Sequence, residues 1–221
     1  MDITQIVKSS FYVTYVFLIT TGTITFIESL RTQNPVIRHI MNLETCISII
    51  AAYFYSIFIS KIYDNKDSNI PYDEVTTLRY TDWMISTPFM LFVLCMVLAN
   101  EKKIPFTIKT YSIILLLDIA MLVSGYLGET HVIDKYTGLF IGFVFLYIMF
   151  AYIWYIYMHN GKNNFIVLFT FLSFLSLWSI YGIAYMTDEK IKNIMYNILD
   201  LISKAFMGIF FWMFFTKSIT F

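Results

Sequence analysis

The sequence predicts an all-α membrane protein, a bundle of seven transmembrane helices that forms a single domain over residues 1–221. Hydrophobic residues make up 58% of the chain and charged residues only 14%, whereas soluble domains average about 25% charged residues. Mostly apolar runs recur along the chain, each long enough to span a bilayer, which takes about 20 residues. The seven runs lie at roughly 5–30, 36–60, 77–99, 105–127, 135–158, 164–187 and 191–217.

Polar connectors such as residues 64–69 and 159–162 separate the runs, and their charges indicate an orientation. The side that would hold the first connector and the C-terminus carries seven Lys and Arg residues, against six on the other side. Because cytoplasmic loops are enriched in these residues, we expect an extracellular N-terminus and a cytoplasmic C-terminus. The formal net charge is zero, so nothing indicates binding to nucleic acid.

Charged side chains remain inside the apolar runs, where an ionised group costs roughly 2.5–3.5 kcal/mol or more. They are Glu44, Arg79, Asp82, Asp118, Asp200 and Lys204. Arg79 lies near the start of its run and could extend its charge toward the interface. Lys204 lies near the middle of the last run. There it must lose its proton, be covalently modified or be held by carboxylates.

Two carboxylates are spaced to hold Lys204. Asp200 precedes it by four residues, so both lie on one face of the same helix. Asp82 can supply a second carboxylate from the third run, and Arg79 lies three residues before it. Two cations against two anions make the neutral set that a buried cluster needs. Such a lysine suits a protonated imine with an aldehyde.

Three segments resemble motifs of the microbial (type I) rhodopsins. Residues 79–88 read RYTDWMISTP, similar to the family signature R-Y-x-D-W-x-x-T-T-P. Residues 200–204 read DLISK, which resembles D-x-x-x-K, and residues 178–185 read WSIYGIAY, similar to W-S-x-Y-P-x-x-W. The resemblance spans all seven runs. It implies a seven-helix bundle around all-trans retinal, whose polyene needs a flat aromatic slot.

The resemblance assigns roles position by position. Lys204 would form the Schiff base, Asp82 would be the primary counter-ion and proton acceptor, and Asp200 the second counter-ion. Arg79 would be the gating arginine. The pocket would be lined by Trp83, Thr87, Met90, Met121, Gly125, Trp178, Tyr181 and Tyr185. Asp118 would pair with Thr87, a contact that suits a structural role as well as a gating role. No metal site is expected.

One departure from the family pattern bears on function. Proton pumps of this family usually carry an acidic proton donor where this chain has Val93. Glu44 is the other acid in the inner half of the spans, so it could replace that donor or form the inner gate of a channel. Gly182 replaces a proline and Tyr185 a tryptophan of the family motif.

Polar residues at helical spacing indicate a hydrated seam between the first, second and seventh helices. The residues assigned to this ion pathway are Ser10, Ser48, Tyr55, Asn193 and Asn197. Ion paths of channelrhodopsins run between the first, second, third and seventh helices, and rings of acids and amides suit cations. The alternative is that hydroxyl groups here only pack helices or bond to backbone carbonyls.

These residues favour a light-activated retinal protein, not an enzyme, that moves cations through a light-gated channel. The alternative is an outward proton pump with Glu44 as donor, and a photosensor is third. In size, in composition and in having Glu44, the chain resembles the rhodopsins of giant algal viruses, and it is most like their channel-type group. The resemblance implies a multi-pass protein of the host cell membrane. The expected partners are the lipid bilayer and the transported cations or protons, and a homo-oligomer is compatible with the sequence.

Overall fold

The computed structural model describes residues 2–64, 70–159 and 161–218, and within them the regular structure is entirely helical. Seven of the described helical segments are long and apolar enough to cross a membrane, which confirms the predicted fold class. The elements are α1 (Ile3–Arg31), α2 (Pro35–Asp64), α3 (Tyr72–Lys102), α4 (Ile108–Glu129), α5 (Lys135–Ile153), η1 (Trp154–Met158), α6 (Phe165–Tyr185), α7 (Glu189–Asp200), η2 (Leu201–Phe206) and α8 (Met207–Phe215).

The helix ends differ from the predicted runs by a few residues. The third helix starts at Tyr72 rather than at residue 77, because its first turn is polar and carries Asp73 and Glu74, which the apolar run leaves out. The last span is not one uniform α-helix, since the π-helical segment η2 separates α7 from α8. Residues 65–69 of the predicted second connector, and residue 160 of the fifth, lie outside the described residues.

Local sequence explains where several helices begin. Proline occupies the first position of α2, where its missing N–H costs no hydrogen bond. The carboxylate of Asp188 accepts hydrogen bonds from the backbone N–H groups of Lys190 and Ile191, which caps α7. Thr107 and Asp134 cap α4 and α5 in the same way.

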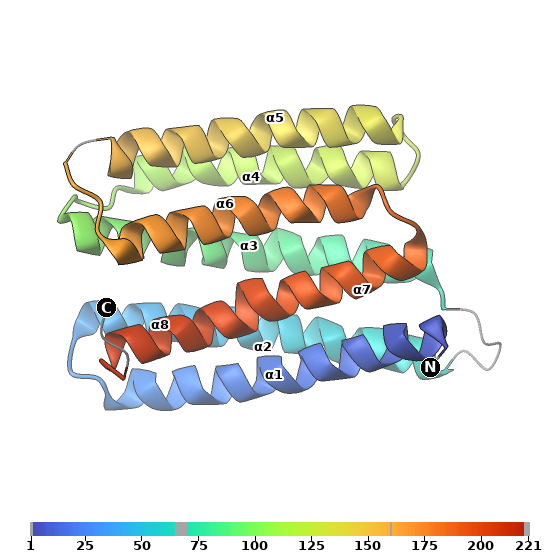
Figure 1. The fold of residues 1–221 in the computed structure, drawn as a ribbon, viewed down its shortest axis with the longest axis horizontal. Coiled ribbons are helices and arrows are strands. Elements are labelled where there is room, and N and C mark those ends of the chain that lie inside the picture. Colours follow the sequence, from blue (N-terminus) through green and yellow to red (C-terminus); the bar gives the residue numbers. More distant parts are fainter. Residues whose placement is uncertain (1, 65–69, 160, 219–221) are drawn as a thin grey trace. The chain divides into compact units, whose positions relative to one another are not determined.

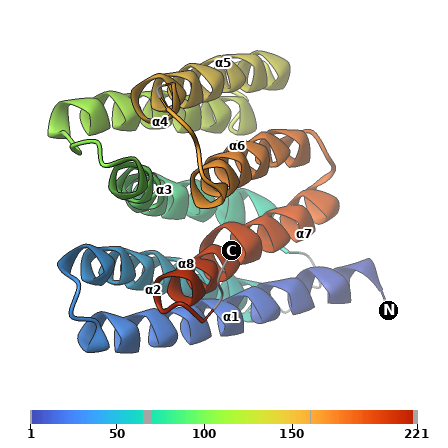
Figure 2. The same ribbon diagram turned by 60° about the vertical axis from the view of Figure 1, so that its left-hand side comes forward.

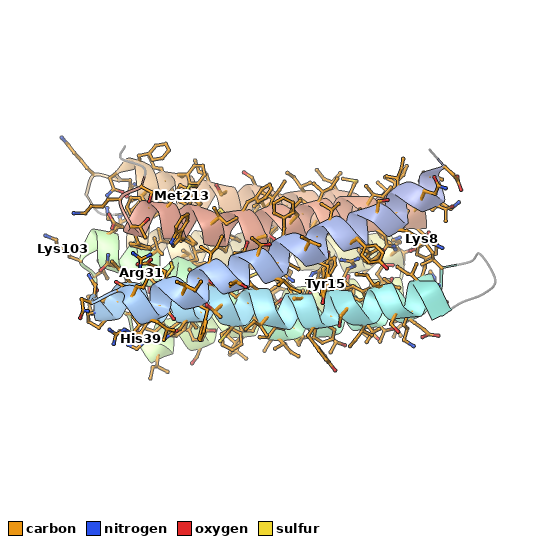
Figure 3. The ribbon with its side chains drawn as sticks, turned by 90° about the horizontal axis from the view of Figure 1, so that it is seen from below. Lys8, Tyr15, Arg31, His39, Lys103 and Met213 are labelled. Atoms are coloured by element: carbon orange, nitrogen blue, oxygen red, sulfur yellow. The ribbon has the colours of Figure 1, made fainter. Side chains whose placement is uncertain are left out.

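The described chain divides into two compact units, residues 1–86 with 183–221 and residues 87–182. In the first unit, α1 and α2 run side by side, and α7, η2 and α8 lie against them (Figure 1). Lys8 lies at one end of this unit, whereas Arg31, His39 and Met213 lie at the other (Figure 3). The expected orientation in the membrane and the single domain stay predictions.

Apolar side chains from α1, α2 and η2 fill the interior of the first unit. Phe11, Leu18, Phe58 and Ala205 are all fully buried there. The two helices α1 and α2 approach closely where α1 carries Gly22, since a Cβ at this position would lie 3.2 Å from that of Ser48. Small residues permit this packing in membranes, where helices have no hydrophobic drive to associate.

The second unit contains the C-terminal part of α3, then α4, α5, η1 and most of α6, and α4 and α5 lie side by side (Figure 2). The α3 helix contains Pro88, and the hydroxyl of Tyr111 on α4 donates a hydrogen bond to the carbonyl oxygen of Pro88 at 2.8 Å. At the end of α3, the Lys102 ammonium donates to Oδ1 of Asn163, just before α6. These bonds tie α4 and α6 to α3.

Gly182, which stands where the family motif has proline, is a packing position. A Cβ there would lie 2.8 Å from Cε2 of Phe143 on α5, and that ring stacks on Tyr147. We expect Gly182→Ala to destabilise the protein by about 1–3 kcal/mol, because the ring must move. Loss of helical circular dichroism on heating in detergent measures this effect.

Gly142→Ala is the matched control, because a Cβ there meets only the carbonyl oxygen of Met121, at an ordinary 3.6 Å. We expect no loss of stability, since alanine favours a helix over glycine by roughly 0.5–1 kcal/mol. Equal melting temperatures for the two variants would contradict the packing role of Gly182.

Candidate functional site

Lys204 lies in the π-helical segment η2, and its side chain is 1% exposed. In a π-helical turn each backbone N–H bonds to the carbonyl group five residues earlier instead of four. Such turns are frequent at functional sites. The hydroxyl of Thr21 on α1 donates a hydrogen bond to the carbonyl oxygen of Ala205 at 3.2 Å. This bond fixes the backbone next to the lysine.

Both predicted carboxylates lie next to the Lys204 amine. Nζ of Lys204 is 2.7 Å from Oδ2 of Asp82 and 3.6 Å from Oδ1 of Asp200. Both acids are fully buried. The second oxygen of Asp82, Oδ1, has no hydrogen-bond partner among the described residues. Lys204 therefore contacts Asp82 directly, and that carboxylate keeps one oxygen available for a proton.

Asp200 is held from three further directions. Its Oδ2 accepts hydrogen bonds from the Tyr55 hydroxyl at 2.8 Å and from Nη1 of Arg79 at 3.2 Å. Its Oδ1 accepts one from the indole N–H of Trp83 at 3.3 Å. Burying an ionised carboxylate is costly unless such donors replace its water. These contacts suit an Asp200 that stays ionised.

Arg79 is 1% exposed and lies among the polar groups predicted for the ion pathway. Its Nη2 donates to Oδ1 of Asn197 at 2.8 Å and to Oδ1 of Asn193 at 3.3 Å. Aromatic rings also surround the guanidinium carbon, with ring centroids 5.1–5.9 Å away. Those rings belong to Phe11, Tyr55, Phe58 and Tyr196. The arginine is therefore buried among partners and does not extend to the interface.

The cluster is electrically neutral, with Arg79 and Lys204 against Asp82 and Asp200. Removing one member of a buried ion pair leaves an uncompensated charge and typically costs about 3–5 kcal/mol. The balance explains how four charged side chains fit inside an apolar bundle.

The structure brings together four of the five residues predicted for the ion pathway. Ser10 and Tyr55 bond directly to the side chain of Asn197, and Asn193 bonds to Arg79. Ser48 is separate: it is fully buried, it lies against Gly22, and its hydroxyl has no partner among the described residues.

Hydroxyl groups on α1 also take the alternative role that the sequence left open. Thr14 donates to the carbonyl oxygen of Asn197 at 3.0 Å, as Thr21 does to that of Ala205. Threonine at these positions thus bonds to backbone carbonyls of the last span.

Glu44 is 3% exposed and lies against α8. A Cβ built on Gly208 would be 3.0 Å from Oε2 of Glu44 and 2.8 Å from Cγ2 of Thr21. Gly208 follows Lys204 by four residues, whereas Asp200 precedes it by four. Among the described residues, Glu44 has no hydrogen bond or ion pair. Its carboxyl group therefore lies without a described partner on the far side of Lys204 from Asp200.

The residues assigned to the retinal pocket are distributed over both units. Trp83 and Tyr185 are buried in the first unit, and the Trp83 ring packs edge-on against Tyr196 at 5.0 Å. The second unit holds Thr87, Met90, Met121, Gly125, Trp178 and Tyr181. There Thr87 donates to Oδ2 of Asp118 at 2.7 Å, as the resemblance predicted. The enclosure of a polyene by Trp83 and Trp178 stays a prediction.

Sequence reasoning missed three features of this site. The π-helical turn at Lys204 has no sequence signature in this chain. The bond from Trp83 to Asp200 depends on a rotamer. Gly208 lies four residues after Lys204, and that spacing could have marked it as a contact point for a neighbouring helix.

Comparison with known proteins identifies the family. The family model described as bacteriorhodopsin-like protein matches residues 5–218. The crystal structure of viral rhodopsin OLPVRII is similar at 43% identity and a TM-score of 0.89, over 97% of this chain and 99% of that one.

Two more distant relatives agree on the fold. Blue light-absorbing proteorhodopsin from Med12 has a TM-score of 0.74 at 20% identity, over 97% of this chain and 99% of its own. Green-light absorbing proteorhodopsin of Gamma-proteobacterium EBAC31A08 is 23% identical, over 63% of this chain and 61% of its own length. The chain thus spans less than two thirds of that relative. It belongs to the bacteriorhodopsin-like family of microbial rhodopsins, integral multi-pass membrane proteins that bind retinal through a Schiff base on a lysine.

Proposed function

We propose that Lys204 carries all-trans retinal and that the protein is a light-driven proton pump, which moves protons from the Glu44 side of Lys204 toward the Arg79 side. The observation that carries this proposal is the asymmetry around Lys204. On one side Asp82 contacts Lys204 and Asp200 is bonded to Arg79, and on the other lies the isolated carboxyl of Glu44. If the N-terminus is extracellular, this direction is outward.

The contacts of Lys204 fit a protonated imine. An imine nitrogen keeps one N–H and one positive charge, and Oδ2 of Asp82 lies 2.7 Å from Nζ, ready to accept that single hydrogen bond. Asp200 supplies the second negative charge at 3.6 Å. By the family resemblance, Trp83, Tyr185 and the pocket residues of the second unit would hold the polyene.

When bound, retinal supplies a light-driven isomerisation that redirects the N–H at Nζ of Lys204. Asp82 is placed to take the proton, because it contacts Nζ directly and its Oδ1 makes no other hydrogen bond among the described residues. Asp200 keeps its charge through Tyr55 and Arg79. Proton transfer therefore goes toward Asp82.

Glu44 is placed to return a proton to Lys204. Its carboxyl lies against Gly208, one helical turn beyond the lysine, and no described cation holds it in the ionised form. An isolated, buried carboxyl favours its neutral, protonated form, which is the form a donor needs. It would replace the acid that α3 lacks at Val93, which is fully buried.

The second candidate is the light-gated cation channel that the sequence favoured. Polar side chains of α1, α2 and α7 do meet in the first unit, at Ser10, Tyr55 and Asn197. In this arrangement they bond to one another and to Arg79, whose positive charge repels a passing cation. A channel would have to break these bonds after light absorption, so the pump is the simpler proposal.

Replacing Lys204 tests the cofactor assignment. Lys204→Ala should abolish the visible absorption band of retinal-supplemented protein, because no amine remains to form the imine. Lys192→Ala is the matched control, since Lys192 is also buried in the last span but pairs with Glu189 at 2.6 Å. Spectra of both purified variants decide the point: a band that survives in Lys204→Ala would refute the assignment.

Replacing Glu44 tests the donor. Glu44→Gln should slow the return to the dark state about 100-fold, a typical contribution of a proton-transferring group, and azide should restore it by carrying protons from solution. Flash spectroscopy measures both effects. The control Glu28→Gln, in the last turn of α1 before Arg31, should recover at the normal rate. An unchanged recovery in Glu44→Gln would remove Glu44 from the mechanism.

Photocurrents separate the two candidates. A pump should give a current of one sign across membrane voltages, unaffected by exchanging sodium for potassium on one side. Whole-cell recording under two cation gradients measures this. A current that reverses with voltage and follows the cation gradient would establish the channel instead.

A further inference from the structure

Asn197 uses its whole side chain to join helices of the first unit. Its Nδ2 donates to the Ser10 hydroxyl on α1 at 2.8 Å. Its Oδ1 accepts from the Tyr55 hydroxyl on α2 at 3.0 Å and from Nη2 of Arg79 on α3 at 2.8 Å. The backbone carbonyl of the same residue accepts from Thr14 at 3.0 Å. One fully buried residue of α7 thus bonds to α1, α2 and α3.

An amide suits this position because it offers a donor on one side and an acceptor for two bonds on the other. A carboxylate would add a third negative charge beside Asp200, and an apolar side chain would remove the shorter of the two bonds from Nη2 of Arg79 and one of the two acceptors near the Tyr55 hydroxyl. A hydrogen bond to a charged group typically contributes about 1.5–3 kcal/mol. The residue therefore matches its surroundings in charge as well as in hydrogen bonding.

Two ends of the Arg79 guanidinium are held by different groups. Nη1 points at Asp200 and Nη2 points at Asn197, and the bond to Asn197 is the shorter at 2.8 Å, against 3.2 Å. A planar guanidinium fixed at both ends cannot rotate without breaking one bond. Nη2 also donates to Asn193 at 3.3 Å, so Asn197 supplies the shorter of the two bonds that orient Arg79 toward Asp200.

We propose that Asn197 is a positioning residue: it holds Arg79 against Asp200 and so sets the charge balance around Lys204. The titratable groups at this point are Asp82 and Arg79 from α3, Tyr55 from α2, and Asp200 and Lys204 from the last span. From α1 the neutral side chains of Ser10, Phe11 and Thr14 face the network. The inference rests on the retinal bond to Lys204 but not on the direction of transport.

The test is an acid titration of the visible absorption band in the retinal-loaded protein. Protonation of the counter-ion shifts this band. In Asn197→Leu, which has a similar shape but no polar atoms, Nη2 of Arg79 loses its 2.8 Å bond and keeps the 3.3 Å bond to Asn193. The guanidinium is then held less firmly, and the carboxylates are less closely paired with it. They should then bind protons more readily, so the midpoint of the colour change should rise by about one pH unit or more.

Thr14→Val is the matched control, because it removes a bond to the Asn197 backbone and leaves the contact with Arg79 in place. Its midpoint should stay near that of the unmodified protein. Should Asn197→Leu fail to fold, Asn197→Ser removes the reach to Arg79 with a smaller change and should raise the midpoint in the same direction.

A double-mutant cycle separates positioning from general packing. If Asn197 acts through Arg79, Asn197→Leu should cause no further shift in an Arg79→Gln background. An equal shift in both backgrounds, or no shift in Asn197→Leu itself, would overturn the proposal. Failure of the pump proposal would be distinguishable, because Glu44→Gln recovery and the sign of the photocurrent do not enter this titration.

Discussion

The structure depends on keeping a cation in the middle of the last span. The side chain of Lys204 is buried at 1% exposure, so its charge must be balanced by neighbouring protein groups. One carboxylate contacts it directly and a second lies 3.6 Å away. Two acids against one lysine would leave a net negative charge, and Arg79 completes the balance. The four charges therefore balance only if the charged parts of α3 and of the last span lie side by side at the same depth in the membrane.

The helices that carry no charge at this depth supply the hydrogen bonds. Tyr55 of α2 donates to Asp200, and α1 contributes the hydroxyls of Ser10, Thr14 and Thr21. Thr21 binds the carbonyl of Ala205 within the π-helical turn, where the backbone pairing changes register. Serine and threonine hydroxyls commonly hydrogen-bond between helices within a membrane. Hydroxyl groups of α1 that could line a polar ion path thus stabilise the segment that carries Lys204.

The parts predictable from sequence are those that follow from length and charge. Spans must be about 20 apolar residues long, and Asp200 and Lys204 lie four residues apart on one helix, so the seven spans and the ion pair could be foreseen. The motif around Asp82 gave its role by resemblance alone. The π-helical turn and the indole bond from Trp83 to Asp200 could not be foreseen, because both depend on backbone register and rotamers set by tertiary packing. Ser48 was grouped with Tyr55 by helical spacing, yet the close approach of Gly22 places it apart from the network.

Directional transport requires that the two sides of the lysine differ before any light is absorbed. Here they differ in kind: Asp82 and Asp200 lie beside a bound cation, whereas Glu44 lies beside Gly208 without a described partner. Asp82 contacts the Lys204 amine and keeps one oxygen without a described partner, so it can take a proton, whereas no described cation holds Glu44 in its ionised form. In the proposed pump, a proton that leaves Nζ of Lys204 toward Asp82 would therefore have its replacement on the opposite side. The positive charge of Arg79 beside Asp200 would at the same time oppose the passage of other cations, so that proton transfer and ion exclusion would follow from one arrangement.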